Sequence, residues 1–156
     1  MTFRSVHHPG SASRALVAAR AQAGPVASGL LCVMVVALAA ALQGYPVLRP
    51  LMLVVPVVYA SAAAVGMYIV QRQPAEVIVA GSKGVIRSVW DVTGPGPAIL
   101  TPIHSAMPRR EGLVVGLGDE VVTLRPEDWP QLEDVHRTLA DAARLAELES
   151  GTVSWT

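Results

Sequence analysis

Acidic residues are absent from the first 75 positions, and charged residues make up only 15% of the 156-residue sequence. Aromatic residues are also scarce, at 4%, whereas 52% of the chain is hydrophobic. The aliphatic excess is concentrated between residues 26 and 70 and follows neither helical nor strand periodicity. Because a single water-soluble domain does not have this balance, the composition indicates a membrane protein.

The residue types that are missing exclude several functions. Cysteine occurs once, as Cys32, so the chain has no internal disulfide. The apolar stretches contain no charged residue, which transporters, proton relays and voltage sensors need at membrane depth, and no histidine that would hold a haem or a pigment. The adjacent His7 and His8 have no cysteine or carboxylate close by in the sequence. We therefore expect no catalytic residue, no cofactor and no metal site.

Two uncharged stretches are long enough to cross a bilayer. Residues 26–43 read VASGLLCVMVVALAAALQ, and residues 51–70 read LMLVVPVVYASAAAVGMYIV. As helices they would measure about 27 Å and about 30 Å, against a hydrocarbon core of about 30 Å. The glycine and prolines of the intervening GYPVLRP break the helix. The sequence therefore predicts a transmembrane hairpin over residues 26–70.

The distribution of charge predicts how this hairpin is oriented. Residues 1–25 form a basic N-terminal arm, expected to be either a short interfacial helix or a loosely ordered segment. From Glu76 onward the chain has 12 acidic and 7 basic residues. The basic flanks of the spans place both termini in the cytoplasm, at the bacterial inner membrane. The acidic domain argues against nucleic acid as a partner.

An N-terminal apolar stretch can also be a signal peptide, here with a cleavage site after Ala41. Cleavage would leave residues 51–70 as a lone anchor with a very short segment before it. The uncleaved hairpin is the preferred interpretation.

Residues in and beside the spans are candidate contacts. Small residues spaced four apart on a helix let a neighbouring helix pack closely. Tyrosines and arginines at the ends of a span anchor it at the membrane interface. The small-residue contacts are Ala37, Ala41, Ala62 and Gly66, and the interface anchors are Arg20, Tyr45, Tyr68 and Arg72.

Residues 71–156 are expected to form a cytoplasmic domain of about five short antiparallel strands and a terminal helix. The segments AEVIVAG and VIRSVWDV flank an SKG turn, AILTPIH follows, and GLVVGL and EVVTLR flank a type II′ turn at Gly118 and Asp119. The helix starts at the N-cap Asp128, and Trp90 and Trp129 are candidate core residues. Its apolar face consists of Leu132, Val135, Leu139, Ala142 and Ala146. The predicted class is an α+β membrane protein.

The segment TPIHSAMPRREG, residues 101–112, concentrates polar groups in this domain. His104 is expected to end a strand, and Met107 with Pro108 to turn the chain. Arg109 and Arg110 then lie in a hairpin loop, where adjacent arginines can bind a phosphate or a carboxylate of a partner. The alternative is that they are ordinary loop charges beside Glu111, which this sequence favours because no second basic cluster reinforces them.

The order of these elements, with VWDV and EVVTLRPEDW in the β domain, resembles small bacterial membrane proteins with a pleckstrin-homology-like domain, notably the YcxB-like group. The resemblance covers residues 26–148, but the N-terminal arm does not read as a leading strand, and five strands are fewer than seven. It implies a non-catalytic scaffold that binds protein or lipid partners.

Three functions remain open on the sequence. The first is a non-enzymatic accessory or assembly subunit of a larger membrane complex, with respiratory and photosynthetic complexes as candidates and an integral membrane protein as partner. The second is a membrane-tethered lipid- or peptide-binding module. The third is a holin-type pore former, against which the long tail after the second span argues.

Overall fold

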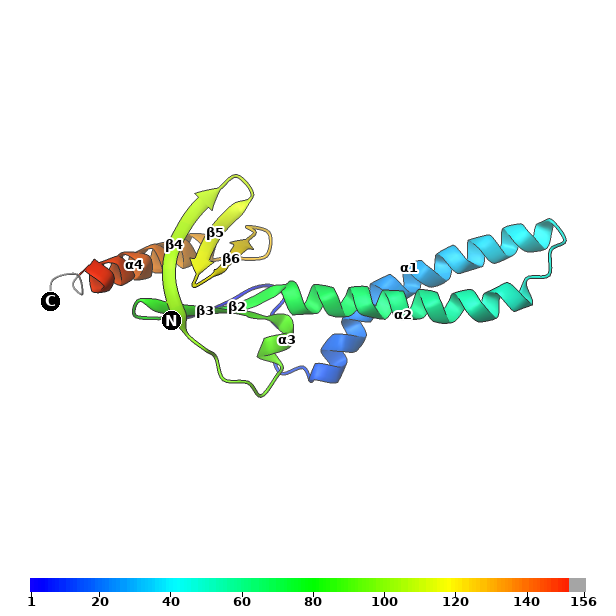
Figure 1. Cartoon of the computed structure of the whole chain (residues 1–156), viewed down its shortest axis with the longest axis horizontal. Helices are drawn as coiled ribbons and strands as arrows, with labels where there is room; N and C mark the ends of the chain where they lie inside the picture. Colours follow the sequence, from blue (N-terminus) through cyan, green and yellow to red (C-terminus); the bar gives the residue numbers. More distant parts are fainter. Residues whose placement is uncertain (152–156) are drawn as a thin grey trace. The chain divides into compact units, whose positions relative to one another are not determined.

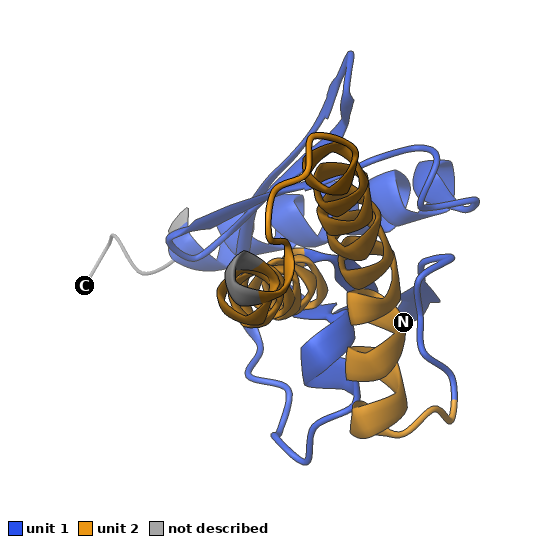
Figure 2. Cartoon of the chain, turned by 90° about the vertical axis from the view of Figure 1, so that its right-hand side faces the viewer, with its two compact units in different colours: residues 1–10, 73–156 blue, residues 11–72 orange. Residues whose placement is uncertain are grey.

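The structure is a computed structural model that describes residues 1–151, with the side chains of residues 49, 50 and 151 excepted. It has two compact units, coloured in Figure 2. We call residues 11–72 the helical unit, and residues 1–10 together with 73–151 the sheet unit. The elements are β1 (Thr2–Arg4), α1 (Arg14–Leu42), α2 (Leu48–Arg72), β2 (Pro74–Ala80), β3 (Lys83–Ser88), α3 (Val89–Val92), β4 (Thr101–Arg109), β5 (Gly112–Leu117), β6 (Glu120–Leu124) and α4 (Leu132–Gly151) (Figure 1).

The helical unit is a hairpin of two helices that are long and apolar enough to cross a membrane, judged by length and composition. The helix α1 begins well before the predicted span at residue 26, because the Ser13 side chain accepts a hydrogen bond from the Leu16 N–H and caps it. Residues 14–25 are therefore helical and continuous with the first apolar stretch. Pro25 and Pro56 lie inside α1 and α2.

The sheet unit contains one antiparallel sheet of six strands in the order β1-β2-β3-β4-β5-β6. The expected α+β class is confirmed, with one strand more than predicted. The additional strand is β1, which belongs to the segment predicted as an arm and pairs with β2, Phe3 opposite Val77. The helical unit is thus inserted in the chain between two neighbouring strands of the sheet unit.

Two segments differ from their predicted conformation. VWDV was expected to continue a strand, but Ser88 and Asp91 form a reciprocal capping box that starts the short helix α3. The strand β4 runs past the expected turn at Met107 and Pro108 as far as Arg109, after a bulge beside His104. Pro108 fits in the strand because it lies opposite Leu113 at a non-hydrogen-bonded position, where no ladder donor is lost.

The core of the sheet unit lies between the sheet and α4, which contacts β4, β2 and β5 (Figure 1). The predicted apolar face of α4 supplies buried Val135, Leu139 and Ala142, with Ala143 buried as well and Leu132 partly buried. Trp129 is in the core as expected, whereas Trp90 is only partly buried. The tight turn at Gly118, where φ is +54°, also agrees with the prediction.

Candidate functional site

A close approach of the α1 and α2 backbones lies at Gly66. A Cβ atom at this position would lie 2.9 Å from the Ala21 carbonyl oxygen, so only glycine allows the two backbones to approach. The Ala21 carbonyl accepts no helical hydrogen bond from residue 25, because Pro25 has no N–H. Ala62, one turn before Gly66, is also buried. These two predicted contact residues are therefore used inside the hairpin and are not available to a partner.

The helices separate toward the loop that connects them (Figures 1 and 2). Beyond the tight contact of Gly29 with Val58, an apolar groove of about 210 Å³ opens between them. Ala37 lies in this groove, and Ala41 is exposed. The groove is lined by Cys32, Val33, Val36, Ala37, Ala40, Val47, Leu51, Val54 and Val58.

A second small-residue strip, which the sequence analysis missed, lies on α2. Ala60 and Ala64 are exposed and spaced four apart, on the side of the helix opposite buried Ala62 and Gly66. The spacing was visible in the sequence, but which of the two strips faces α1 depends on how the helices are rotated. Ala60 and Ala64 are therefore a pair of small residues, spaced four apart, that α2 leaves exposed, in contrast to buried Ala62 and Gly66.

The predicted interface anchors lie at the two ends of the hairpin. The Arg72 guanidinium lies 4.8 Å from the centre of the Tyr68 ring, a cation–π contact at the end of α2. Arg20 is exposed in the first half of α1. Tyr45 is 64% exposed in the connecting loop, at the other end of the helices.

Arg109 and Arg110 lie at the tip of the β4–β5 hairpin, Arg109 as the last residue of β4 and Arg110 in the turn. Both are exposed, and the neighbouring Met107 is 54% exposed. Among the described arginines from residue 73 onward, these two have no acidic partner. The others pair as Arg87–Glu76, Arg125–Glu127, Arg137–Glu133 and Arg144–Asp141.

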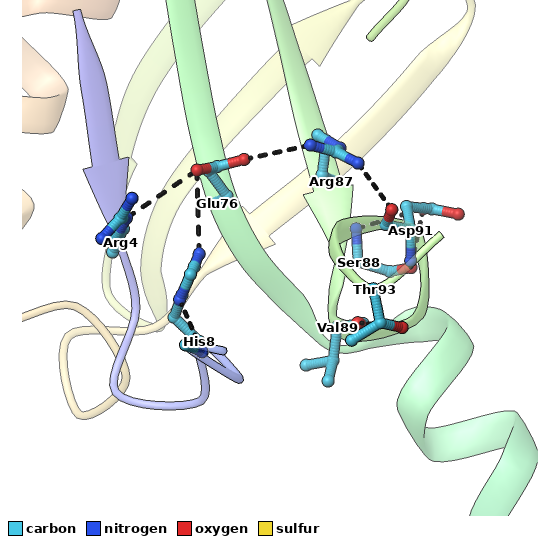
Figure 3. A network of polar contacts seen from close by, with 9 residues as sticks. Arg4, His8, Glu76, Arg87, Ser88, Val89, Asp91 and Thr93 are labelled. Atoms are coloured by element: carbon cyan, nitrogen blue, oxygen red, sulfur yellow. Dashed lines mark hydrogen bonds and ion pairs between the residues drawn. The ribbon is translucent and has the colours of Figure 1, made fainter. Parts of the chain in front are cut away.

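A polar network around buried Glu76 fastens the N-terminal segment to the sheet (Figure 3). The Glu76 carboxylate lies 3.4 Å from Arg87, 3.7 Å from His8 and 3.9 Å from Arg4. The Nε2 atom of the neighbouring His7 lies 2.7 Å from the Asp128 carboxylate. Asp128 was expected to be the N-cap of the terminal helix, but α4 begins at Leu132. Sequence reasoning missed this network because its members are far apart in the chain.

The sheet unit also has an open cleft of about 420 Å³ at the end of α4. Ser82 is buried at its edge and donates a hydrogen bond of 2.6 Å to the Glu149 carboxylate. Lys83, His104 and Glu147 also line this cleft. Within residues 1–151, no group of three or more histidine, cysteine, aspartate or glutamate side chains is arranged to hold a metal ion.

Comparison with known proteins gives no relative: no family model, no curated protein and no solved structure matches the chain. The resemblance to pleckstrin-homology-like membrane proteins therefore depends on the order of the elements alone.

Proposed function

We propose that this chain is a non-enzymatic accessory or assembly subunit of a larger complex in the bacterial inner membrane. In this proposal the helical unit crosses the bilayer twice, and the sheet unit lies in the cytoplasm. The partner is an integral membrane protein that packs against the hairpin.

The pairing of β1 with β2 is the observation that supports this topology. β1 precedes the hairpin and β2 follows it, and two strands can share hydrogen bonds only on the same side of a membrane. Both ends of the hairpin then lie on one side, as two crossings require. Cleavage of a signal peptide after Ala41 would remove β1, so the pairing also favours an uncleaved first span. Arg14, Arg20 and Arg72 at these ends favour the cytoplasmic side.

The surface of the hairpin supports a helical partner. Large apolar side chains such as Leu31, Met34 and Leu53 are more than 60% exposed, which only lipid or another helix would cover. Because lipid tails are as apolar as leucine, helices associate in a bilayer through close packing at small residues. The exposed Ala60 and Ala64 provide such a strip.

The test is extraction of the full chain from its native membrane in a mild detergent, followed by native sizing and mass spectrometry. We expect stoichiometric membrane proteins to accompany the wild type. The paired change Ala60→Leu and Ala64→Leu should remove them, whereas Val65→Leu, on another exposed side of α2, should retain them. A wild-type chain that elutes alone or only with copies of itself would contradict the proposal.

A lipid- or peptide-binding module is the second candidate. It is favoured by exposed Met107 and the neighbouring Arg109 and Arg110, which have no acidic partner among the described residues. The antiparallel sheet closed by a C-terminal helix supports the pleckstrin-homology-like resemblance, on which this candidate depends. The full chain in neutral proteoliposomes should then tether anionic vesicles. Replacement of both arginines by glutamate should abolish tethering, and Arg144→Glu, at an exposed paired arginine, should not. Tethering that survives loss of both arginines would exclude the lipid form of this candidate.

A further inference from the structure

The outer edge of β6 is an unoccupied strand edge. β6 is the last strand of the sheet and has β5 as its neighbour. Within residues 1–151, no backbone hydrogen bond reaches its other side. Val121 is 72% exposed, and Thr123 is exposed on the same face. An edge of this kind is a template for a further strand.

The register of the β5–β6 hairpin determines which backbone groups face outward. Leu117 and Glu120 flank a two-residue turn and form a hydrogen-bonded pair. The pairs then alternate, so Val121 and Thr123 occupy non-hydrogen-bonded positions opposite β5. Their N–H and C=O groups therefore point away from β5. The edge thus presents two donors and two acceptors.

We propose that this edge pairs with β6 of a second copy of the chain, antiparallel and about a two-fold axis at Val122. In this register Val121 faces Thr123 of the second copy, and each of these pairs exchanges two hydrogen bonds. Symmetry gives two such pairs, so all the outward groups of both edges are satisfied. Pro126, which has no N–H, follows shortly after β6 and ends the ladder.

The charges at the two ends of β6 favour a second copy over a strand of another protein. The same register places Asp119 opposite Arg125 of the second copy, and by symmetry Arg125 opposite Asp119. Asp119 is exposed and has no ion pair within the described part of the chain, and the Arg125 side chain is 67% exposed. The β6 edge of one chain therefore has the hydrogen-bond donors, the acceptors and the two charges that complement the same edge of a second chain.

The contact is small, so its strength depends on how the copies are held. Four hydrogen bonds and two exposed ion pairs bury much less than the area of about 1,200 Å² typical of stable complexes. Two copies anchored in one membrane meet at a raised effective concentration, so the pairing is tested with the full chain in membranes.

Cysteine cross-linking tests the register. In a Cys32→Ser background, Val122→Cys places two thiols at a non-hydrogen-bonded pair, with Cα atoms about 4.5 Å apart, which suits a disulfide. Oxidation in proteoliposomes should give a covalent dimer at least about tenfold more abundant than with Leu145→Cys, an exposed position on α4. Equal yields at the two positions would overturn the proposal, as would native-membrane cross-links exclusively to another protein.

Two further variants test the bonding. In the Val122→Cys chain, Thr123→Pro removes an outward N–H without touching the β5 ladder and should abolish the dimer, whereas Thr123→Val should keep it. Asp119→Arg should weaken cross-linking several-fold, and adding Arg125→Asp should restore it. Tryptophan fluorescence, to which buried Trp129 contributes, reports whether each variant is folded. A folded Thr123→Pro chain that still cross-links, or failed restoration by the charge exchange, would contradict the two-fold pairing.

Discussion

The sheet unit and the helical unit use apolar residues in opposite ways. In the sheet unit, Leu113, Leu124 and Leu139 are at most 2% exposed and belong to one contiguous core. In the helical unit, Leu38 and Leu53 are 62% and 75% exposed, and the two helices approach each other tightly at Gly29 and Gly66. The sheet unit is therefore organised by side-chain burial, as in water. The helical unit is organised by backbone approach and leaves its apolar side chains to the surrounding medium.

Truncation of leucines should separate the units most sharply. Leu139→Ala removes a fully buried side chain and should lower the free energy of unfolding by about 2–5 kcal/mol. Leu53→Ala, on the exposed face of α2, should change it by no more than about 0.5 kcal/mol. Denaturant unfolding of the full chain in detergent micelles, followed by circular dichroism, measures both. Equal losses of unfolding free energy in the two variants would mean that the exposed face of α2 is packed as tightly as the core of the sheet unit.

Removing the Glu76 charge should have the next largest effect. Glu76→Gln leaves Arg4 and Arg87 without their carboxylate inside the sheet unit and should cost about 1–3 kcal/mol. Hydrogen exchange of residues 2–8 should increase with it. The control Glu127→Gln breaks an ion pair whose side chains are both more than 60% exposed, and should have little effect. Unchanged exchange in the N-terminal segment would contradict the fastening role of Glu76.

Two glycines test whether backbone approach holds the hairpin together. Gly66→Ala places a methyl group against the Ala21 carbonyl and should destabilise the helix pair by about 1–3 kcal/mol. Gly24→Ala, where the added atom meets nothing within 4 Å, should be neutral or stabilising by up to about 1 kcal/mol. Distances between spin labels on α1 and α2 report the separation. Identical behaviour of the two variants would show that the contact at Gly66 is dispensable.

The smallest effect is expected at the cap of α1. Ser13→Ala removes the acceptor for the Leu16 N–H and should cost about 1 kcal/mol of helix stability. Hydrogen exchange of the first turn of α1 measures this loss. Ser11→Ala, outside the cap, serves as the control, and a similar change in both would argue against capping by Ser13.

The contrast between the units also explains what could be predicted from the sequence. The two long apolar helices and the tight turn at Gly118 are predicted by local signals, and both are present in the structure. The strand β1 was missed because its three residues carry no periodic pattern and its partner Val77 lies far along the chain. The VWDV segment has strand-forming residues, but the capping box of Ser88 and Asp91 outweighs that preference.

For the predicted contact residues, the residue types indicated that a contact was possible, but the sequence did not show which neighbouring element each residue faces. The spacing of Ala62 and Gly66 correctly indicated a close helix contact, but α1 of the same chain occupies it. Arg109 and Arg110 were expected in a loop and do lie at a hairpin tip, whereas their lack of acidic partners depends on the neighbouring elements. Pairing between distant residues, as at Glu76, requires the fold.

The insertion of the hairpin between β1 and β2 sets an order for biosynthesis. The first strand leaves the ribosome before residues 11–72 and waits unpaired until β2 follows. At about 5–20 residues per second, this delay is roughly 3–12 s. In the proposed topology, both helices therefore leave the ribosome before the sheet can be completed. A hairpin with its two ends on opposite sides of the membrane would keep β1 from β2, so closure of the sheet would select chains with both ends on one side.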